Sequence, residues 1–290
     1  MVTIGNGVLT ARIDENGAQL CSLASPTTEY IYDDFKVWPK HAPVLFPFAG
    51  RLFEQKFRYG GREYGPVPIH GFAPYAKYVA CGLPDSSVTM EMVVTDEIRA
   101  IWPFDFGFSV HFELKGATLS ITYKVTNKGR STMYYGMGSH PGFNVPISKG
   151  LAFEDYYIEF PKAGDVLRNM MDDACLDTGC QEPYTNVSNG RLPLGHGLFD
   201  RDAVILSNTG HRAVIKSDKD TKSITVDYPD TRYCAVWHKV KMEVPFVCIE
   251  PWTSLPGCAG KVVELEGKAD YNALPGGCSR DHHLDITINE

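Results

Sequence analysis

Short segments in which apolar and polar residues alternate run along almost the whole chain. An alternation with a period of two predicts β-strands that bury one face. Asn-Gly pairs at Asn6-Gly7 and Asn16-Gly17, and the step Lys115-Gly116, separate neighbouring segments and predict β-hairpins. The predicted strands span residues 2–4, 8–13, 19–25, 87–94, 108–115, 117–127, 156–160, 203–207, 213–217, 223–228, 234–238, 246–250 and 284–288.

Helical patterns are sparse. The stretch 95–102 has a threonine at its start, two acids in its first turn and Pro103 just after it, which predicts one short helix. Residues 256–260 suit a turn or a short 3₁₀ piece. We find no repeat of fixed period, no low-complexity tract and no linker. The chain is therefore expected to form a single domain over residues 1–290, all-β, built as a large two-sheet antiparallel β-sandwich.

Composition narrows the choice of partners. The 290 residues are 43% hydrophobic and 22% charged, an ordinary globular balance, and the formal net charge is −7. Nucleic acid and anionic membranes both require a basic face, so neither is expected as a partner, whereas a neutral ligand stays open. No apolar run approaches the roughly 20 residues of a membrane span, and no signal-peptide pattern opens the chain, so we expect a cytoplasmic protein. The eight cysteines form no C-x-x-C pair and are expected to be buried free thiols.

Four segments interrupt the strand pattern, at residues 41–51, 68–73, 136–146 and 247–254. In the first, two prolines and a glycine exclude a regular central strand, and Arg51 ends an apolar run as a charge that could enter a pocket. The alternative is a surface loop with a solvated arginine. In the second, His70 lies beside Gly71, and the alternative is a hydrogen-bonded histidine beneath a loop.

The other two segments carry stronger chemical signals. Three glycines and two prolines surround His140, which is typical of a rigid loop that lets a ligand approach the backbone. Glu250 ends an apolar strand, where a buried carboxylate is costly unless it is hydrogen-bonded or functional, and Trp252 offers a flat surface for a sugar. The alternatives are an incidental histidine in a turn and a strand-end glutamate facing water.

Together the segments supply one arginine, two histidines and one glutamate. They lack metal-ligand spacing, and the chain has no G-x-S-x-G motif, no phosphate-cradling glycine loop and no dinucleotide fingerprint. General acid–base chemistry on a neutral polar ligand, without metal or cofactor, is the remaining interpretation.

The order of these segments resembles the aldose 1-epimerase (galactose mutarotase) family, particularly its LacX-like branch. The resemblance covers nearly the whole chain and rests on the segments 43–52, His-Gly-Phe at 70–72, Trp-Pro-Phe-Asp-Phe at 102–106, 119–127, Ser-His-Pro-Gly-Phe-Asn at 139–144 and Ile-Glu-Pro-Trp at 249–252. It implies a mutarotase-like supersandwich with a sugar in an open cleft on the concave sheet. It implies Glu250 as general base, His140 as general acid and His70 as a hydrogen-bonding residue near C1 and the ring oxygen.

The resemblance also implies residues that bind the sugar. Arg51 would hold a hydroxyl, and so would an aspartate before a later strand, for which Asp202 is preferred over Asp200 because the strand follows it directly. The expected partner is a monosaccharide, and a homodimer is compatible with the chain.

The expected activity is interconversion of the α and β anomers of a free aldose. A sugar-phosphate mutarotase and a non-catalytic carbohydrate-binding sandwich are the alternatives. Phosphate would require several Lys or Arg in the cleft. If the ligand is a neutral sugar, the cleft should hold Arg51 but no cluster of further Lys and Arg. Lys56, Arg58 and Arg201 nevertheless lie near the motifs in the sequence.

Overall fold

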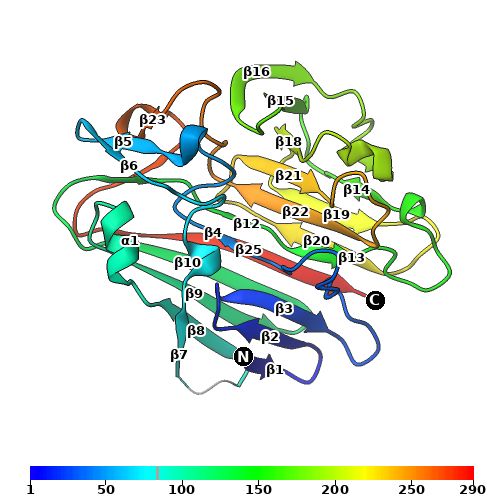
Figure 1. The fold of residues 1–290 in the computed structure, drawn as a ribbon. Helices are drawn as coiled ribbons and strands as arrows, with labels where there is room; N and C mark the ends of the chain where they lie inside the picture. The colour runs from blue at the N-terminus through cyan, green and yellow to red at the C-terminus, as the bar shows by residue number, and fades with distance from the viewer. Residues whose placement is uncertain (83–84) are drawn as a thin grey trace.

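The computed structural model describes residues 1–82 and 85–290, and two large antiparallel sheets dominate it (Figure 1). Within the described residues the larger sheet has nine strands. Their spatial order is β17 (Arg191–Pro193), β14 (Tyr157–Glu159), β19 (Arg212–Lys216), β20 (Ser223–Asp227), β25 (Ser279–Asn289), β10 (Thr118–Asn127), β9 (Phe106–Lys115), β8 (Ser87–Met92) and β7 (Tyr78–Cys81).

The second sheet carries the residues of greatest chemical interest. Its order in the described part of the chain is β16 (Asp177–Pro183), β15 (Leu167–Met171), β18 (Val204–Ser207), β21 (Tyr233–Trp237), β22 (Phe246–Trp252), β12 (Gly138–Ser139) and β4 (Val44–Leu45). β13 (Gly142–Asn144) also pairs with β22, so the strands on either side of residues 140–141 both lie against one partner.

Smaller elements cover the ends of the two sheets. The small sheets are β1 (Val2–Gly5) with β2 (Thr10–Asp14) and β3 (Gln19–Ala24), β23 (Val263–Glu264) with β5 (Phe57–Tyr59) and β6 (Arg62–Tyr64), and β11 (Met133–Tyr135) with β24 (Asn272–Leu274). The helices are α1 (Asp96–Ile101) and the 3₁₀ turns η1 (Phe53–Gln55), η2 (Ala73–Tyr75), η3 (Phe153–Asp155), η4 (His196–Phe199) and η5 (Leu265–Gly267). Within the described ranges, no helix combines the length and the apolar character needed to cross a membrane.

Alternation along the strands places the core between the two sheets. In β9 every second residue is buried, and the β9–β10 hairpin pairs Lys115 with Thr118 across Gly116, as the sequence predicts. Apolar residues of the nine-stranded sheet, such as Phe112, share one continuous core with Val247 and Ile249 of β22. The prediction of an all-β sandwich is therefore confirmed.

Strand β22 is buried on both faces, and this positions the site. Val247 and Ile249 point into the main core, so the alternate residues Cys248, Glu250 and Trp252 point to the opposite face of the sheet. That face is covered by loops rather than by a second sheet. A carboxylate at the centre of this strand is therefore buried without being in the sandwich core.

Several local predictions can be compared with the structure. α1 begins after Thr95, whose Oγ1 accepts a hydrogen bond from the Ile98 N–H at 3.4 Å, as predicted. Residues 256–260 form a turn and not a 3₁₀ helix. The β15–β16 hairpin is missing from the predicted strands because β16 is almost entirely exposed and lacks the alternating pattern.

The cysteine prediction is only partly right. All eight thiols are free, but only Cys21, Cys234 and Cys248 are buried. The other five lie on turns, strand edges and the cavity described below, where the small thiol side chain needs no apolar enclosure.

Candidate active site

Strand register places His140 directly across from Glu250. On one side β12 pairs Gly138 with Trp252, and on the other β13 pairs Gly142 with Cys248, both antiparallel to β22. Residue 140 lies midway between the two pairings and residue 250 lies midway between their partners. Close packing also requires small residues here, because a Cβ on Gly142 would approach the Trp38 ring to 2.7 Å.

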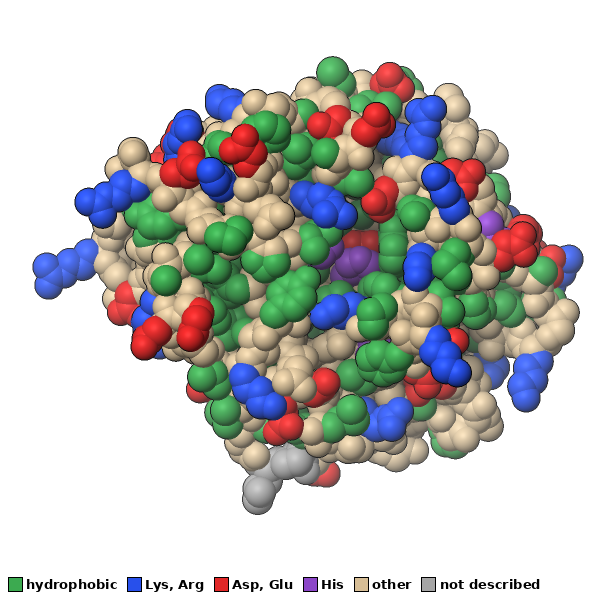
Figure 2. Space-filling view, in the orientation of Figure 1, with side chains coloured by type: hydrophobic (Ala, Val, Ile, Leu, Met, Phe, Trp, Pro, Cys, Tyr) green, Lys and Arg blue, Asp and Glu red, His purple; other side chains and the backbone are tan. Residues whose placement is uncertain are grey.

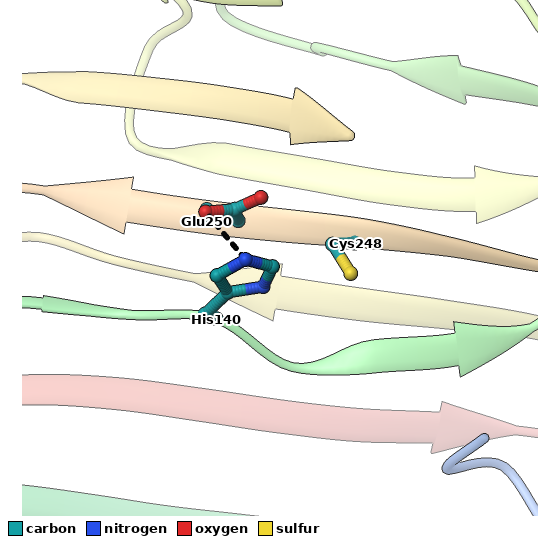
Figure 3. Close-up of side chains that lie close together, drawn as sticks. All are labelled: His140, Cys248 and Glu250. Atoms are coloured by element: carbon teal, nitrogen blue, oxygen red, sulfur yellow. Dashed lines mark ion pairs between the residues drawn. The ribbon is translucent and has the colours of Figure 1, made fainter. Parts of the chain in front are cut away.

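His140 and Glu250 form a buried pair. The imidazole Nε2 lies 3.3 Å from the carboxylate Oε2, and the two side chains are 9% and 2% exposed. Figure 3 shows the ring pointing from its loop toward the carboxylate on β22. Among the described residues, His140 Nδ1 and Glu250 Oε1 have no hydrogen-bond partner, which is costly for buried polar atoms and typical of groups reserved for a ligand.

Burial shifts the pKa values of the two groups in opposite directions. It raises the pKa of Glu250 well above its ordinary 4.5, with the charge of Asp202 adding to the rise. It lowers the pKa of His140 well below 6.5, with His70 as a further cause. Both shifts disfavour a charged group at this position. The two shifts therefore favour the state in which the pair holds one proton and carries no net charge.

His70 is held at the edge of the pair by an unusual backbone. Its φ is +66°, a left-handed conformation uncommon for non-glycine residues, and its N–H donates to the carbonyl of Gly50 at 2.8 Å. The next residue must be glycine, because at φ +75° a Cβ on Gly71 would come within 2.3 Å of the Phe46 carbonyl oxygen. The ring lies at right angles to that of His140, with centroids 5.5 Å apart.

Hydrogen bonding defines the tautomer of His70. The Gly50 N–H donates to Nδ1 at 3.1 Å, so Nδ1 is an acceptor and the proton of the neutral ring resides on Nε2. Burial, and then the positive charges of Arg51 and Lys40, lower the pKa of His70 to about 3. His70 is therefore a neutral hydrogen-bond donor and not a proton source at neutral pH.

One cavity of about 300 Å³ is lined by all five residues expected at the site. This volume is at the lower end of the range for small-molecule pockets. The space-filling view shows a hollow whose floor contains acidic and histidine atoms and whose border includes Lys and Arg side chains (Figure 2). The expected residues that share it are His70, His140, Glu250, Arg51 and Asp202.

Asp202, and not Asp200, lines the cavity. It precedes β18 with a φ of +82°, and its Oδ2 accepts a hydrogen bond from the Cys175 thiol at 3.2 Å. Cys175 is also left-handed, with φ +62°, so three residues in this uncommon conformation line a single cavity. Asp200 is the exposed C-cap of η4.

Two tryptophans in the cavity wall are absent from the sequence-based site. The His140 ring packs against both Trp38 and Trp237, at centroid distances of 5.1 Å and 5.5 Å. Trp252, which the sequence analysis did single out, lies 6.2 Å from His70. Trp237 could have been found from its position at the end of a predicted strand, but Trp38 lies in a segment without periodicity.

Two additional cations also line the cavity, contrary to the expectation of Arg51 alone. Lys40 and Arg201 are part of its lining together with Arg51. The other basic residues near Arg51 in the sequence, Lys56 and Arg58, contact Glu63 instead, at 2.8 Å and 3.3 Å. Lys40 directly precedes the interrupted segment 41–51, but its local sequence carries no motif that would single it out.

Cys248 gives the site a third group with metal-binding capacity. Ligand atoms of His140, Cys248 and Glu250 lie within 4.8 Å of one another (Figure 3). Thiolate is the form that binds metals, and burial with the nearby Glu250 raises the pKa of this thiol well above its ordinary value. A protonated thiol beside a neutral pair is a poor cation site, so the residues fit acid–base chemistry better than metal binding.

The family follows from comparison with known proteins. Residues 1–266 match the family model described as aldose 1-epimerase. The chain belongs to the aldose 1-epimerase family. Within this family it is 28% identical to the plasmid protein LacX of Lactococcus lactis, over 99% of both chains.

Solved structures of aldose 1-epimerase relatives have the same fold. A galactose mutarotase-like protein from Lactobacillus casei is 31% identical, with a TM-score of 0.93 and full coverage of both chains. A galactose mutarotase related enzyme from Lactobacillus acidophilus is 30% identical, with a TM-score of 0.92 over 100% of this chain and 97% of the other. The resemblance inferred from the motifs, and the mutarotase-like β-sandwich that it implies, are thus confirmed.

Proposed function

We propose that this aldose 1-epimerase relative is a mutarotase that interconverts the α and β anomers of an aldose with a free C1 hydroxyl. The observation that carries the proposal is the buried His140–Glu250 pair, 3.3 Å apart, beside the neutral donor His70 in one cavity. Opening a hemiacetal requires one group that accepts a proton and one that donates a proton to the same ring.

In the proposed mechanism Glu250 acts as carboxylate and His140 as imidazolium. Glu250 removes the proton from the C1 hydroxyl while His140 protonates the ring oxygen O5. The C1–O5 bond breaks, and C1 becomes the aldehyde carbon. Rotation about C1–C2 presents the other face of the aldehyde, and reversal of both proton transfers closes the ring as the other anomer.

The pKa shifts support this division of roles. A carboxylate whose pKa is raised is a stronger base, and an imidazolium whose pKa is lowered is a stronger acid. After both transfers Glu250 and His140 are neutral, which is the form that burial favours. When the ring closes, Glu250 returns its proton to the C1 oxygen and His140 takes the proton of the O5 hydroxyl, so the carboxylate and the imidazolium are regenerated.

The remaining cavity residues are proposed to orient the sugar. His70 can donate from Nε2 to the oxygen on which charge develops, because Nδ1 already accepts from Gly50. Arg51 and Asp202 are proposed to bind hydroxyls. Trp252 provides an apolar face against which a pyranose ring can stack.

Polarimetry on freshly dissolved α-glucose and α-galactose tests the proposal. We expect the approach to the equilibrium rotation to accelerate with the wild-type protein and to stay near the uncatalysed rate with Glu250→Gln. A protein that binds these sugars or their 6-phosphates without changing the rate would be a carbohydrate-binding module, which is the alternative to an enzyme.

A further inference from the structure

The cavity is positively charged although the chain as a whole is negative. Its lining contains the cations Lys40, Arg51 and Arg201, whereas the chain has a formal net charge of −7. Asp202 is the carboxylate in this lining besides Glu250, so three cations face two carboxylates. An excess of positive charge in a concave site attracts and binds anions.

Among the described residues, some basic side chains have a carboxylate partner, and the three cavity cations do not. Lys216 contacts Glu159 at 3.0 Å, and Lys56 contacts Glu63 at 2.8 Å. Within residues 1–82 and 85–290, no carboxylate oxygen lies within 4.0 Å of the charged nitrogens of Lys40, Arg51 or Arg201. Cations that converge without a protein counter-ion are typical of sites for an anionic ligand.

Lys40 is the least exposed of the three cavity cations. Its side chain is half-buried, and its Nζ lies 4.7 Å from the centre of the Tyr75 ring, which also lines the cavity. Burial lowers the pKa of Lys40, so the ammonium would gain from an anion in contact with it. A solvated lysine on an open surface would have neither constraint.

The cations lie close to the reactive groups. Arg51 and Lys40 line the same cavity as His70, which is proposed to contact the ring oxygen, and their charges lower the pKa of His70. In a pyranose C5 is bonded to that ring oxygen and carries C6. A phosphate on the primary hydroxyl therefore lies on the same side of the ring as the ring oxygen, and not at the far end of the sugar.

We propose that the substrate of this site is an aldose phosphorylated on its primary hydroxyl, with the phosphate bound by Lys40, Arg51 and Arg201. This inference rests on the proposed mutarotase activity and names its substrate class. Phosphate is favoured over the single charge of a uronic acid because it presents three acceptor oxygens and nearly two negative charges to three cations. The reaction at C1 and O5 is unchanged, and the phosphate takes no part in bond making or breaking.

The test compares matched sugars at equal ionic strength. Anomer exchange is measured for glucose, glucose 6-phosphate, galactose, galactose 6-phosphate and glucuronate by polarimetry or by magnetisation transfer between anomer resonances. We expect kcat/KM for each 6-phosphate to exceed that of its free sugar by at least about 10-fold, because a charge-assisted contact is worth roughly one to two factors of ten. Inorganic phosphate should inhibit competitively, and KM for the 6-phosphates should rise with salt.

Variants assign the effect to the cavity. Lys40→Met and Arg201→Gln should each reduce the ratio of kcat/KM for the 6-phosphate over the free sugar by about 10-fold or more. Lys124→Gln, which removes an exposed cation from β10 on the other sheet, should leave both the ratio and the individual rates unchanged. Thermal unfolding of each variant excludes a loss of folded protein as the cause.

The outcomes separate this inference from the proposed function. Free sugars turned over as well as their 6-phosphates would overturn the phosphate proposal and leave the mutarotase intact. Glucuronate matching glucose 6-phosphate would also overturn it, since any anion would then suffice. A preference for the 6-phosphates that survives in both cavity variants would contradict the assigned residues. No exchange with any of the five sugars would refute the mutarotase itself, and this proposal with it.

Discussion

His140 and Glu250 face each other because two short strands, one before and one after the histidine, pair with the same strand that carries the glutamate. The resulting 3.3 Å contact between Nε2 and Oε2 depends on backbone pairing and not on flexible side-chain reach. Such rigid placement suits acid–base catalysis, where small displacements of the reacting groups are costly. It also makes each partner testable by substitutions that preserve shape.

Glu250→Gln should lower kcat by about 10²- to 10⁴-fold, the usual contribution of a positioned base. The amide keeps the shape of the side chain but cannot accept the proton. His140→Asn should have a similar effect, and the double variant should lose less than the product of the two single losses because the residues act as a unit. Glu243→Gln, at an exposed site before β22, serves as the matched control. Near wild-type turnover by Glu250→Gln on the best substrate would exclude the mechanism.

The pH profile of kcat/KM should be bell-shaped, because activity requires that the pair hold a single proton. A glutamate and a histidine with ordinary pKa values of 4.5 and 6.5 share a single proton only between those values. Here the pKa of His140 is lowered, so the second proton binds only at a pH well below 6.5, and this sets the acid limb. The pKa of Glu250 is raised, so the last proton leaves only at a pH well above 4.5, and this sets the alkaline limb. Limbs that fall at the ordinary values of 4.5 and 6.5 would show that burial does not shift the pKa values of the pair.

His70→Asn should reduce kcat less than either substitution in the pair. Its proposed role is to donate a hydrogen bond from a neutral ring whose pKa is about 3, so no limb of the pH profile should belong to it. We expect a loss on the order of 10-fold, the value of one hydrogen bond to a developing charge. If the acid limb of the profile moved in this variant while kcat fell as far as in His140→Asn, His70 would be the proton donor instead.

Exhaustive chelation with EDTA should leave the mutarotation rate unchanged. The pKa of Cys248 is raised by burial, so its protonated thiol binds metal poorly beside His140 and Glu250. Cys248→Ser should accordingly keep most of the activity. Activity lost on chelation and restored by one added divalent ion would instead make these three residues a metal centre.

Substitution of two glycines separates the cost of left-handed backbone strain from the cost of a steric conflict beside His70. Gly71→Ala should destabilise the protein by about 2–4 kcal/mol, because it adds left-handed strain and a Cβ only 2.3 Å from the Phe46 carbonyl oxygen. Gly60→Ala is the control, since Gly60 also has a positive φ but open space around it, and should cost about 1 kcal/mol. Equal midpoints in urea for the two variants would show that the loop relaxes around the added methyl group.

Much of the architecture follows from the sequence alone. Strict alternation in segments such as Phe106–Lys115 predicts half-buried strands, since only one face of each strand can be covered by the core. The same reasoning misses β16, because an exposed edge strand needs no apolar face. The four interrupted segments contain Arg51, His70, His140 and Glu250, and the family resemblance, which rests on the order of the motifs, added Asp202.

Only the tertiary structure decided how the site is charged and protonated. Nothing in the local sequence of Lys40 links it to Arg201, and loops from distant parts of the chain bring both to one cavity. The raised pKa of Glu250 and the lowered pKa of His140 have the same origin, because desolvation depends on every group packed around a side chain and not on its neighbours along the chain. Sequence pattern therefore determined which residues meet the core and which interrupt the strands. The distances, burial and net charge that set their chemistry arise only when segments far apart in the chain pack together.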